Sequence, residues 1–153
     1  MALPKPEVGL VIRFNYLWRR ERDQGHENAR YPRPCAIILS HRRAADGLTI
    51  VMVAPITHSA PTSHDQALEI PPRVKDHLGL DDARSWIVTD EVNEFAWPGF
   101  DLEPNQDGGI AYGILPPRLY TKIRDMVLES ARSGSLGRIP PNHGPRPPQR
   151  RSA

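Results

Sequence analysis

Two short stretches of the sequence place groups suited to binding phosphate beside strand-like apolar runs. Residues 51–58, VMVAPITH, are apolar or β-branched until they finish on Thr57 and His58. Residues 31–40, YPRPCAIILS, begin a similar run directly after Arg33. A guanidinium offers two N–H donors that match two phosphate oxygens, and a threonine hydroxyl can hold another. Such a pair could stabilise the charge that develops on a phosphoryl group when the 2′-hydroxyl of RNA attacks the adjacent phosphorus.

The same chemistry requires a group that moves a proton, and two histidines are available for it. An unperturbed histidine titrates near neutral pH, which suits His26 and His58 to the task. A more ordinary interpretation stays open, because surface histidines are usually only solvated and a threonine at a strand end often just forms a turn. His58 also shares a loop with His64 and Asp65, but their spacing matches no zinc motif. We therefore expect neither a metal site nor another cofactor.

The elements that carry Arg33 and Thr57 are predicted to be adjacent. Residues 34–40 and 48–56 are both typical of buried strands, and the sequence AADG at 44–47 has the composition of a hairpin turn. In an antiparallel pair the start of one strand lies beside the end of the other. The two side chains are therefore expected at one rim of the sheet.

A second group of candidates surrounds the end of the first predicted strand, residues 8–18. This strand runs out into residues 19–30, a polar segment without periodicity that is expected to form a long loop. Aromatic side chains at such an exit can stack on bases, although core packing is the favoured interpretation for Tyr16 and an equally open one for Trp18. The candidate RNA-binding residues are Tyr16, Trp18, Arg19 and Arg30.

The remaining pattern favours a mainly β (α+β) domain with one long helix near its end. Residues 116–134 carry apolar side chains at helical spacing, with proline at the start and glycine after the end, as in an amphipathic helix. We expect a small barrel over residues 1–133 with this helix as its cover. Residues 134–153 are rich in proline and arginine and are expected to be a disordered tail without a catalytic role. The other expected elements are strands at 67–70, 85–92 and 108–115 and a helical turn within 71–80.

Composition restricts the class of protein only broadly. The chain has 153 residues, 39% hydrophobic and 25% charged, with a net charge of +2, which is typical of a globular domain and does not by itself indicate a nucleic-acid partner. Neither an apolar run of membrane-spanning length nor a secretory leader is evident, so we expect a cytoplasmic location and no membrane partner. A single cysteine, Cys35, agrees with a reducing compartment and is expected to be a buried apolar residue.

Taken together in their order, several segments resemble the PemK/MazF family of toxins from type II toxin–antitoxin systems. The segments are GLVI at 9–12, RPCAIILS at 33–40, VAPITH at 53–58 and IVTDEVN at 87–93. The resemblance implies an SH3-like (CcdB/PemK-type) barrel, a homodimer, an antitoxin protein as partner, and metal-independent cleavage of single-stranded RNA. It implies that Arg33 acts on the phosphate together with Thr57.

The resemblance adds two further site residues and leaves two alternatives. It places Asp90 at a strand aspartate of the family and His26 in a loop where some members carry a catalytic histidine. Glu91 stands where the family usually has glutamine, and the connection at 63–86 is longer than is common. One alternative is a CcdB-like toxin that binds gyrase, which the basic ending RPPQRRSA disfavours. The other is a catalytically inactive relative that binds RNA or protein.

Overall fold

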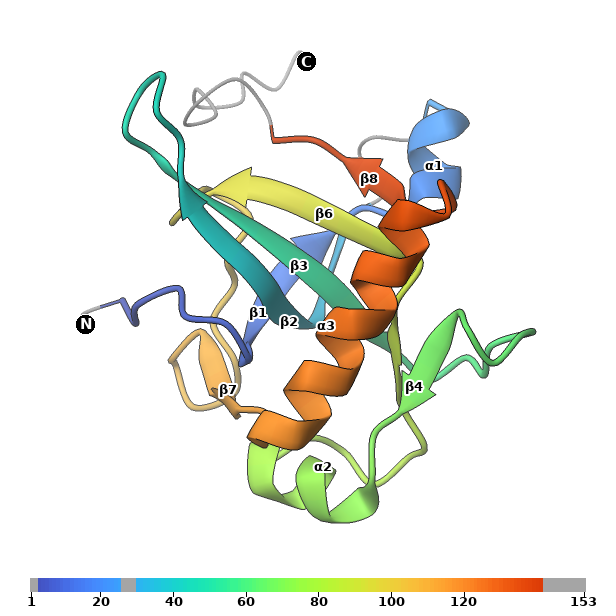
Figure 1. The fold of residues 1–153 in the computed structure, drawn as a ribbon. Helices are drawn as coiled ribbons and strands as arrows, with labels where there is room; N and C mark the ends of the chain where they lie inside the picture. The colour runs from blue at the N-terminus through green and yellow to red at the C-terminus, as the bar shows by residue number, and fades with distance from the viewer. Residues whose placement is uncertain (1–2, 26–29, 142–153) are drawn as a thin grey trace.

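The protein, described by a computed structural model over residues 3–25 and 30–141, is built around one curled sheet (Figure 1). Its eight strands form a mainly antiparallel half-barrel, which confirms a mainly β fold but does not establish the SH3-like type. The strand order is β4-β5-β3-β2-β1-β7, with β6 paired to β3 and β8 paired to β6. The elements are β1 (Leu10–Tyr16), α1 (Arg19–Asp23), β2 (Tyr31–Arg42), β3 (Thr49–Thr57), β4 (Ala67–Glu69), α2 (Pro72–Leu78), β5 (Trp86–Val88), β6 (Glu91–Ala96), β7 (Ala111–Ile114), α3 (Pro117–Arg132) and β8 (Gly137–Ile139).

The predicted hairpin between β2 and β3 is confirmed. The two strands are antiparallel, with Cys35 opposite Pro55 and Arg42 opposite Thr49. Gly47 in the connecting turn has φ 72°, a left-handed conformation that glycine adopts without the steric cost of a Cβ atom. β2 begins earlier than expected, so Arg33 lies inside the strand rather than before it.

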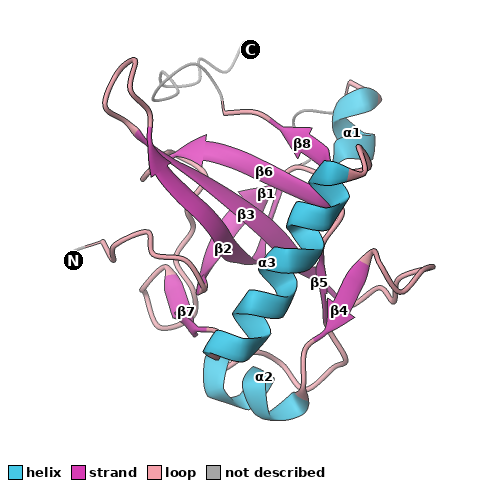
Figure 2. Ribbon diagram, viewed as in Figure 1, coloured by secondary structure: helices cyan, strands magenta, loops and turns pink. Residues whose placement is uncertain are grey.

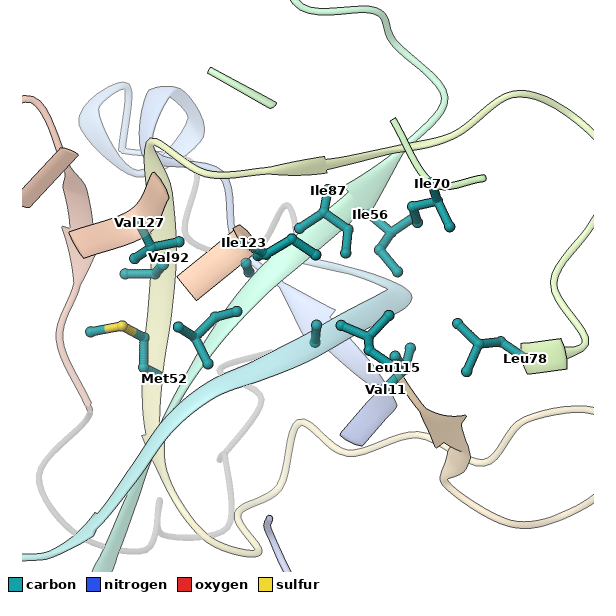
Figure 3. Close-up of a cluster of buried hydrophobic side chains, with 13 residues drawn as sticks. Val11, Met52, Ile56, Ile70, Leu78, Ile87, Val92, Leu115, Ile123 and Val127 are labelled. Atoms are coloured by element: carbon teal, nitrogen blue, oxygen red, sulfur yellow. The ribbon is translucent and has the colours of Figure 1, made fainter. Parts of the chain in front are cut away.

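Apolar side chains pack on both faces of the sheet. Alternate residues of β1 point to opposite sides, so that Val11 joins one cluster while Ile12 and Phe14 join another. The first cluster lies under α3, which crosses that face of the sheet and contributes the fully buried Ile123 and Val127 (Figures 2 and 3). The predicted amphipathic helix is thus present and covers the core. No helix in the described part of the chain is long and apolar enough to cross a membrane.

Residues 19–30 were expected to be a loop, and for their first part this is wrong. The segment Arg19–Asp23 is a short helix, α1, and residues 26–29 lie outside the described residues. The carboxylate of Glu91 accepts a hydrogen bond from the backbone N–H of Arg19 at 2.9 Å, which satisfies one of the free donors at the helix start. The helix therefore depends on a side chain 72 positions away, which no local pattern could reveal.

The expected boundary at residue 133 is also corrected. After α3 the chain forms β8, which pairs in parallel with β6 and buries Ile139 to 5% exposure. Leu136 packs against the first core cluster as well. Two aliphatic residues were enough to bring this part of the expected tail into the fold. The rest of that tail, residues 142–153, lies outside the described residues.

Removal of β8 should therefore destabilise the protein. Deleting residues 134–153 exposes β6 along one edge and removes the buried Ile139, so we expect the free energy of unfolding to fall by about 2 to 5 kcal/mol. Deleting only residues 142–153 keeps β8 and is the matched control. Urea denaturation of both truncations measures the difference, and equal midpoints would show that β8 contributes nothing.

Candidate functional site

A cavity of about 380 Å³ opens at the rim where β2 and β3 meet the loop that follows β3. This volume lies in the range of roughly 300 to 1,000 Å³ that is usual for small-ligand sites. The structure brings four of the predicted site residues to its wall and adds residues from the loop 59–66. The lining residues are Trp18, Arg20, Arg33, Thr57, Ser59, Ala60, Pro61, Thr62, Gln66, Ala67, Val88 and Asp90.

Arg33 supplies a guanidinium whose donors are largely unused. Its central carbon lies 5.1 Å from the centre of the Trp18 ring, and Nη1 makes one long contact of 3.4 Å to the carbonyl oxygen of Ile56. Its Nε is buried without a hydrogen-bond partner, and no carboxylate of the described residues forms an ion pair with it. A half-buried cation that has unused N–H donors and lines a cavity is suited to bind an anion.

Thr57 is the last residue of β3 and lies on the same rim. The register that sets Cys35 opposite Pro55 brings Thr57 to the level of Arg33, and both line the cavity. The Thr57 hydroxyl oxygen accepts a hydrogen bond of 3.2 Å from the backbone N–H of Ser59, as in the turn-forming role considered from the sequence. That bond uses the oxygen as an acceptor, so the hydroxyl hydrogen is left to donate to a ligand.

Trp18 owes its position to a buried amide on β6. The Asn93 side chain accepts a hydrogen bond from the backbone N–H of Leu17 and donates one to its carbonyl, both at 2.9 Å. These bonds fix the chain where β1 ends, so that the half-buried Trp18 ring lies edge-on to Tyr16 at 5.1 Å and beside Arg33. Trp18 is the aromatic side chain that lines the cavity, so it is the one that a bound base could contact there.

Asp90, in the bend between β5 and β6, is the ionisable acid on the cavity wall. Burial raises the pKa of its carboxyl above the ordinary value for aspartate, and the carboxylate of Asp65 raises this pKa further, whereas Arg19 opposes the shift. The neighbouring Glu91 also has a pKa raised by burial, but it is occupied with hydrogen bonds from Arg19 and Tyr16. An acid with a raised pKa can exchange protons closer to neutral pH.

The structure does not bring His58 to the cavity. Its Nε2 lies 2.9 Å from a carboxylate oxygen of Asp81, and the other oxygen of Asp81 accepts a hydrogen bond of 2.7 Å from the buried Lys75. The second predicted histidine, His26, lies outside the described residues. Of the proton-transfer candidates that the structure describes, Asp90 alone lines the cavity.

Three of the four predicted RNA-binding residues are placed elsewhere. Tyr16 is fully buried, and its hydroxyl donates to Glu91 at 3.0 Å, so it is not available to a base. Arg30 lies 3.7 Å from Asp101, and Arg19 lies 3.7 Å from Asp23. Neither arginine lines the cavity, whereas Trp18 does.

Residues that the sequence reasoning missed come mainly from the loop after Thr57. Arg20 reaches the cavity beside Trp18, with its guanidinium carbon 6.0 Å from the ring centre. Thr62 and Gln66 also line the cavity. The polar composition of residues 57–66, directly after a predicted site residue, was the available signal.

Two further observations bear on the chemistry that the site could support. Cys35 is fully buried, and burial raises the pKa of its thiol, so it remains neutral and unsuited to act as a nucleophile. Within the described ranges, no group of three or more His, Cys, Asp or Glu side chains is arranged to hold a metal ion.

Comparison of the chain with protein-family models, curated proteins and solved structures gives no match in any of the three.

Proposed function

We propose that the chain is a metal-independent endoribonuclease that cleaves single-stranded RNA, as the toxin of a type II toxin–antitoxin system would. The observation that carries this proposal is the unpaired guanidinium of Arg33, half-buried in a cavity beside Thr57 and Asp90. A cation kept without a carboxylate partner costs stability, and such a cost is typical of functional sites.

In this proposal each residue has one role. Asp90 takes the proton from the 2′-hydroxyl as the oxygen attacks the adjacent phosphorus. Arg33 and the Thr57 hydroxyl donate hydrogen bonds to the phosphoryl oxygens, on which negative charge grows. The bond to the 5′-oxygen breaks, that oxygen takes a proton from solvent, and a 2′,3′-cyclic phosphate is left on the upstream fragment. Trp18 stacks on a neighbouring base and holds the strand in the cavity.

The resemblance to PemK/MazF toxins supplies the biological context of the proposal. From it we infer an antitoxin protein and a second copy of the chain as partners. The alternative of an RNA-binding relative without activity shares the same cavity, and a direct assay separates the two.

Incubation of the purified protein with single-stranded RNA tests the function. We expect cleavage to persist in excess chelator, because the guanidinium of Arg33 takes the part that a metal ion plays in other nucleases, and we expect products that end in a 2′,3′-cyclic phosphate. The same oligonucleotide as DNA lacks the attacking hydroxyl and should stay intact. Binding of RNA without cleavage would favour the alternative that the protein is an inactive, RNA-binding relative. Loss of activity in chelator would exclude a metal-independent mechanism.

A further inference from the structure

Gln66 stands in a wall of the cavity where no role has yet been assigned. It follows the loop that leads from Thr57 into β4, on the right of Figure 1, and its side chain is half-buried. Gln66 and Asp90 line both the main cavity and a neighbouring smaller cavity of about 200 Å³. Gln66 therefore borders the space that a ligand of the Arg33 site would fill.

The amide of Gln66 is held in one orientation. Its Oε1 accepts a hydrogen bond of 2.8 Å from the hydroxyl of Thr62 and another of 3.2 Å from the backbone N–H of Thr62. A backbone N–H can only donate, so the atom facing it must be the amide oxygen and not the nitrogen. The usual ambiguity between the oxygen and the nitrogen of a glutamine side chain is thus removed.

With both bonds on the oxygen, the amide nitrogen is left unused. Nε2 carries two N–H donors and makes no hydrogen bond to any described residue. A group in this state can donate to a ligand but cannot accept from one. It therefore favours a ligand that presents an acceptor, such as a carbonyl oxygen, and disfavours one that presents an amino group at the same place.

We propose that Gln66 selects the base bound in this cavity, and that it favours the keto bases guanine and uracil over the amino bases adenine and cytosine. This inference rests on the proposed function, from which it takes single-stranded RNA as the substrate. It adds the identity of the base next to which the enzyme cuts. Trp18 supplies the stacking surface, Arg33 the phosphate contact, and Gln66 the donor that reads the O6 of guanine or the O4 of uracil. Thr62 is a positioning residue, because it acts only through the amide that it holds.

Gln66→Glu is the sharpest test, since it changes the chemistry of the group and little of its shape. The oxygen held by Thr62 is retained, while the two N–H donors are replaced by an acceptor oxygen. Four RNA oligonucleotides that differ only in carrying G, U, A or C at one position of a uniform single strand are cleaved at pH 8. We expect the wild type to favour G and U by roughly five- to a hundredfold, and the variant to favour A and C.

Controls separate base reading from the added charge. Gln66→Ala removes the donor without adding charge and should make the four rates similar. Gln106→Glu adds the same charge at an exposed glutamine on a different cavity and should keep the wild-type preference. Thr62→Val frees one of the two bonds on the amide oxygen and should weaken the preference without reversing it. A Gln66→Glu variant with the wild-type preference would overturn the inference, even if cleavage itself is confirmed.

Binding measurements keep this test independent of activity. The same four oligonucleotides are made with a 2′-deoxy sugar at the cleavage position, which blocks the attack, and their dissociation constants are measured by fluorescence anisotropy. If no RNA is cut but G and U bind more tightly and Gln66→Glu reverses the order, base selection stands and the proposed cleavage fails. If the four bind equally to the wild type, or if none binds, base selection by Gln66 is wrong.

Discussion

Replacement of Arg33 by alanine should lower the rate of RNA cleavage by about a hundred- to thousandfold while the protein stays folded. The loss of one preorganised donor to a developing oxyanion typically raises the barrier by about 3 to 4 kcal/mol, and each 1.4 kcal/mol corresponds to about a factor of ten in rate. Since Arg33 has no ion-pair partner among the described residues, its removal leaves no carboxylate uncompensated. The fold loses the packing on Trp18 and one long contact to the carbonyl oxygen of Ile56, so thermal unfolding should change little.

Arg13 provides a matched control for this variant. It is also half-buried with an Nε that has no hydrogen-bond partner, but it lines a separate cavity beside α2. Arg13→Ala should therefore keep the cleavage rate, whatever it does to stability. Arg33→Lys keeps the charge but not the two parallel donors and should recover only part of the activity. A folded Arg33→Ala protein that cuts RNA at the wild-type rate would show that the site lies elsewhere.

The position of Arg33 beside Thr57 could be predicted because it depends on a short hairpin. A tight turn brings the two strands side by side and so places Arg33 near Thr57, although a register shift between Ile37 and Leu39 moves the pairing by one residue before it reaches them. The helix α3 could be predicted for a similar reason, since its apolar spacing is local. Both features follow from residues that are near one another in the chain.

The features that could not be predicted depend on contacts between distant residues. Trp18 lines the cavity because the side chain of Asn93 holds Leu17, from which it is 76 positions away in the chain. His58 is turned away because Asp81, on another loop, pairs with it. The strand β8 forms because β6 offers an unpaired edge to a segment whose composition suggested disorder. A sequence pattern shows which side chains are available, but the packing decides which of them reach the site.

Replacement of Asp90 by asparagine should also have a large effect, and one that depends on pH. A general base typically contributes about a hundred- to ten-thousandfold to the rate, so Asp90→Asn should lower cleavage within that range. In the wild type the base must be ionised, and the rate should rise with pH through the raised pKa of Asp90 and then level off. Asparagine cannot titrate, so the variant should lack this rise. Measurement of the cleavage rate from pH 4 to 8 for both proteins tests the assignment.

The raised pKa of Asp90 also predicts how the stability of the fold depends on pH. The cleavage rate should rise as Asp90 ionises, whereas the stability of the fold should fall. Because burial raises the pKa of Asp90, the folded protein binds this proton more tightly than the unfolded chain does. Its contribution is therefore favourable at low pH and is lost as the pH rises through the raised pKa. The charged groups around Asp90 are Arg20 and Arg33, which line the main cavity with it, Asp65 and Glu129, which line the neighbouring smaller cavity, Arg19 on α1, and the adjacent Glu91. Burial and the carboxylate of Asp65 raise the pKa of Asp90 by more than a backbone hydrogen bond and Arg19 lower it, so ionising Asp90 costs stability in the fold.

Asp90→Asn should consequently melt at a higher temperature than the wild type, with a difference that grows as the pH rises through the raised pKa. At low pH, where the wild-type carboxyl is protonated and resembles the amide, the two melting temperatures should converge. Calorimetry of both proteins at several pH values measures this. A structural acid that stabilised the fold in its ionised form would give the opposite trend. Lower activity combined with higher stability in the same variant is the expected mark of a residue retained for chemistry at a cost to the fold.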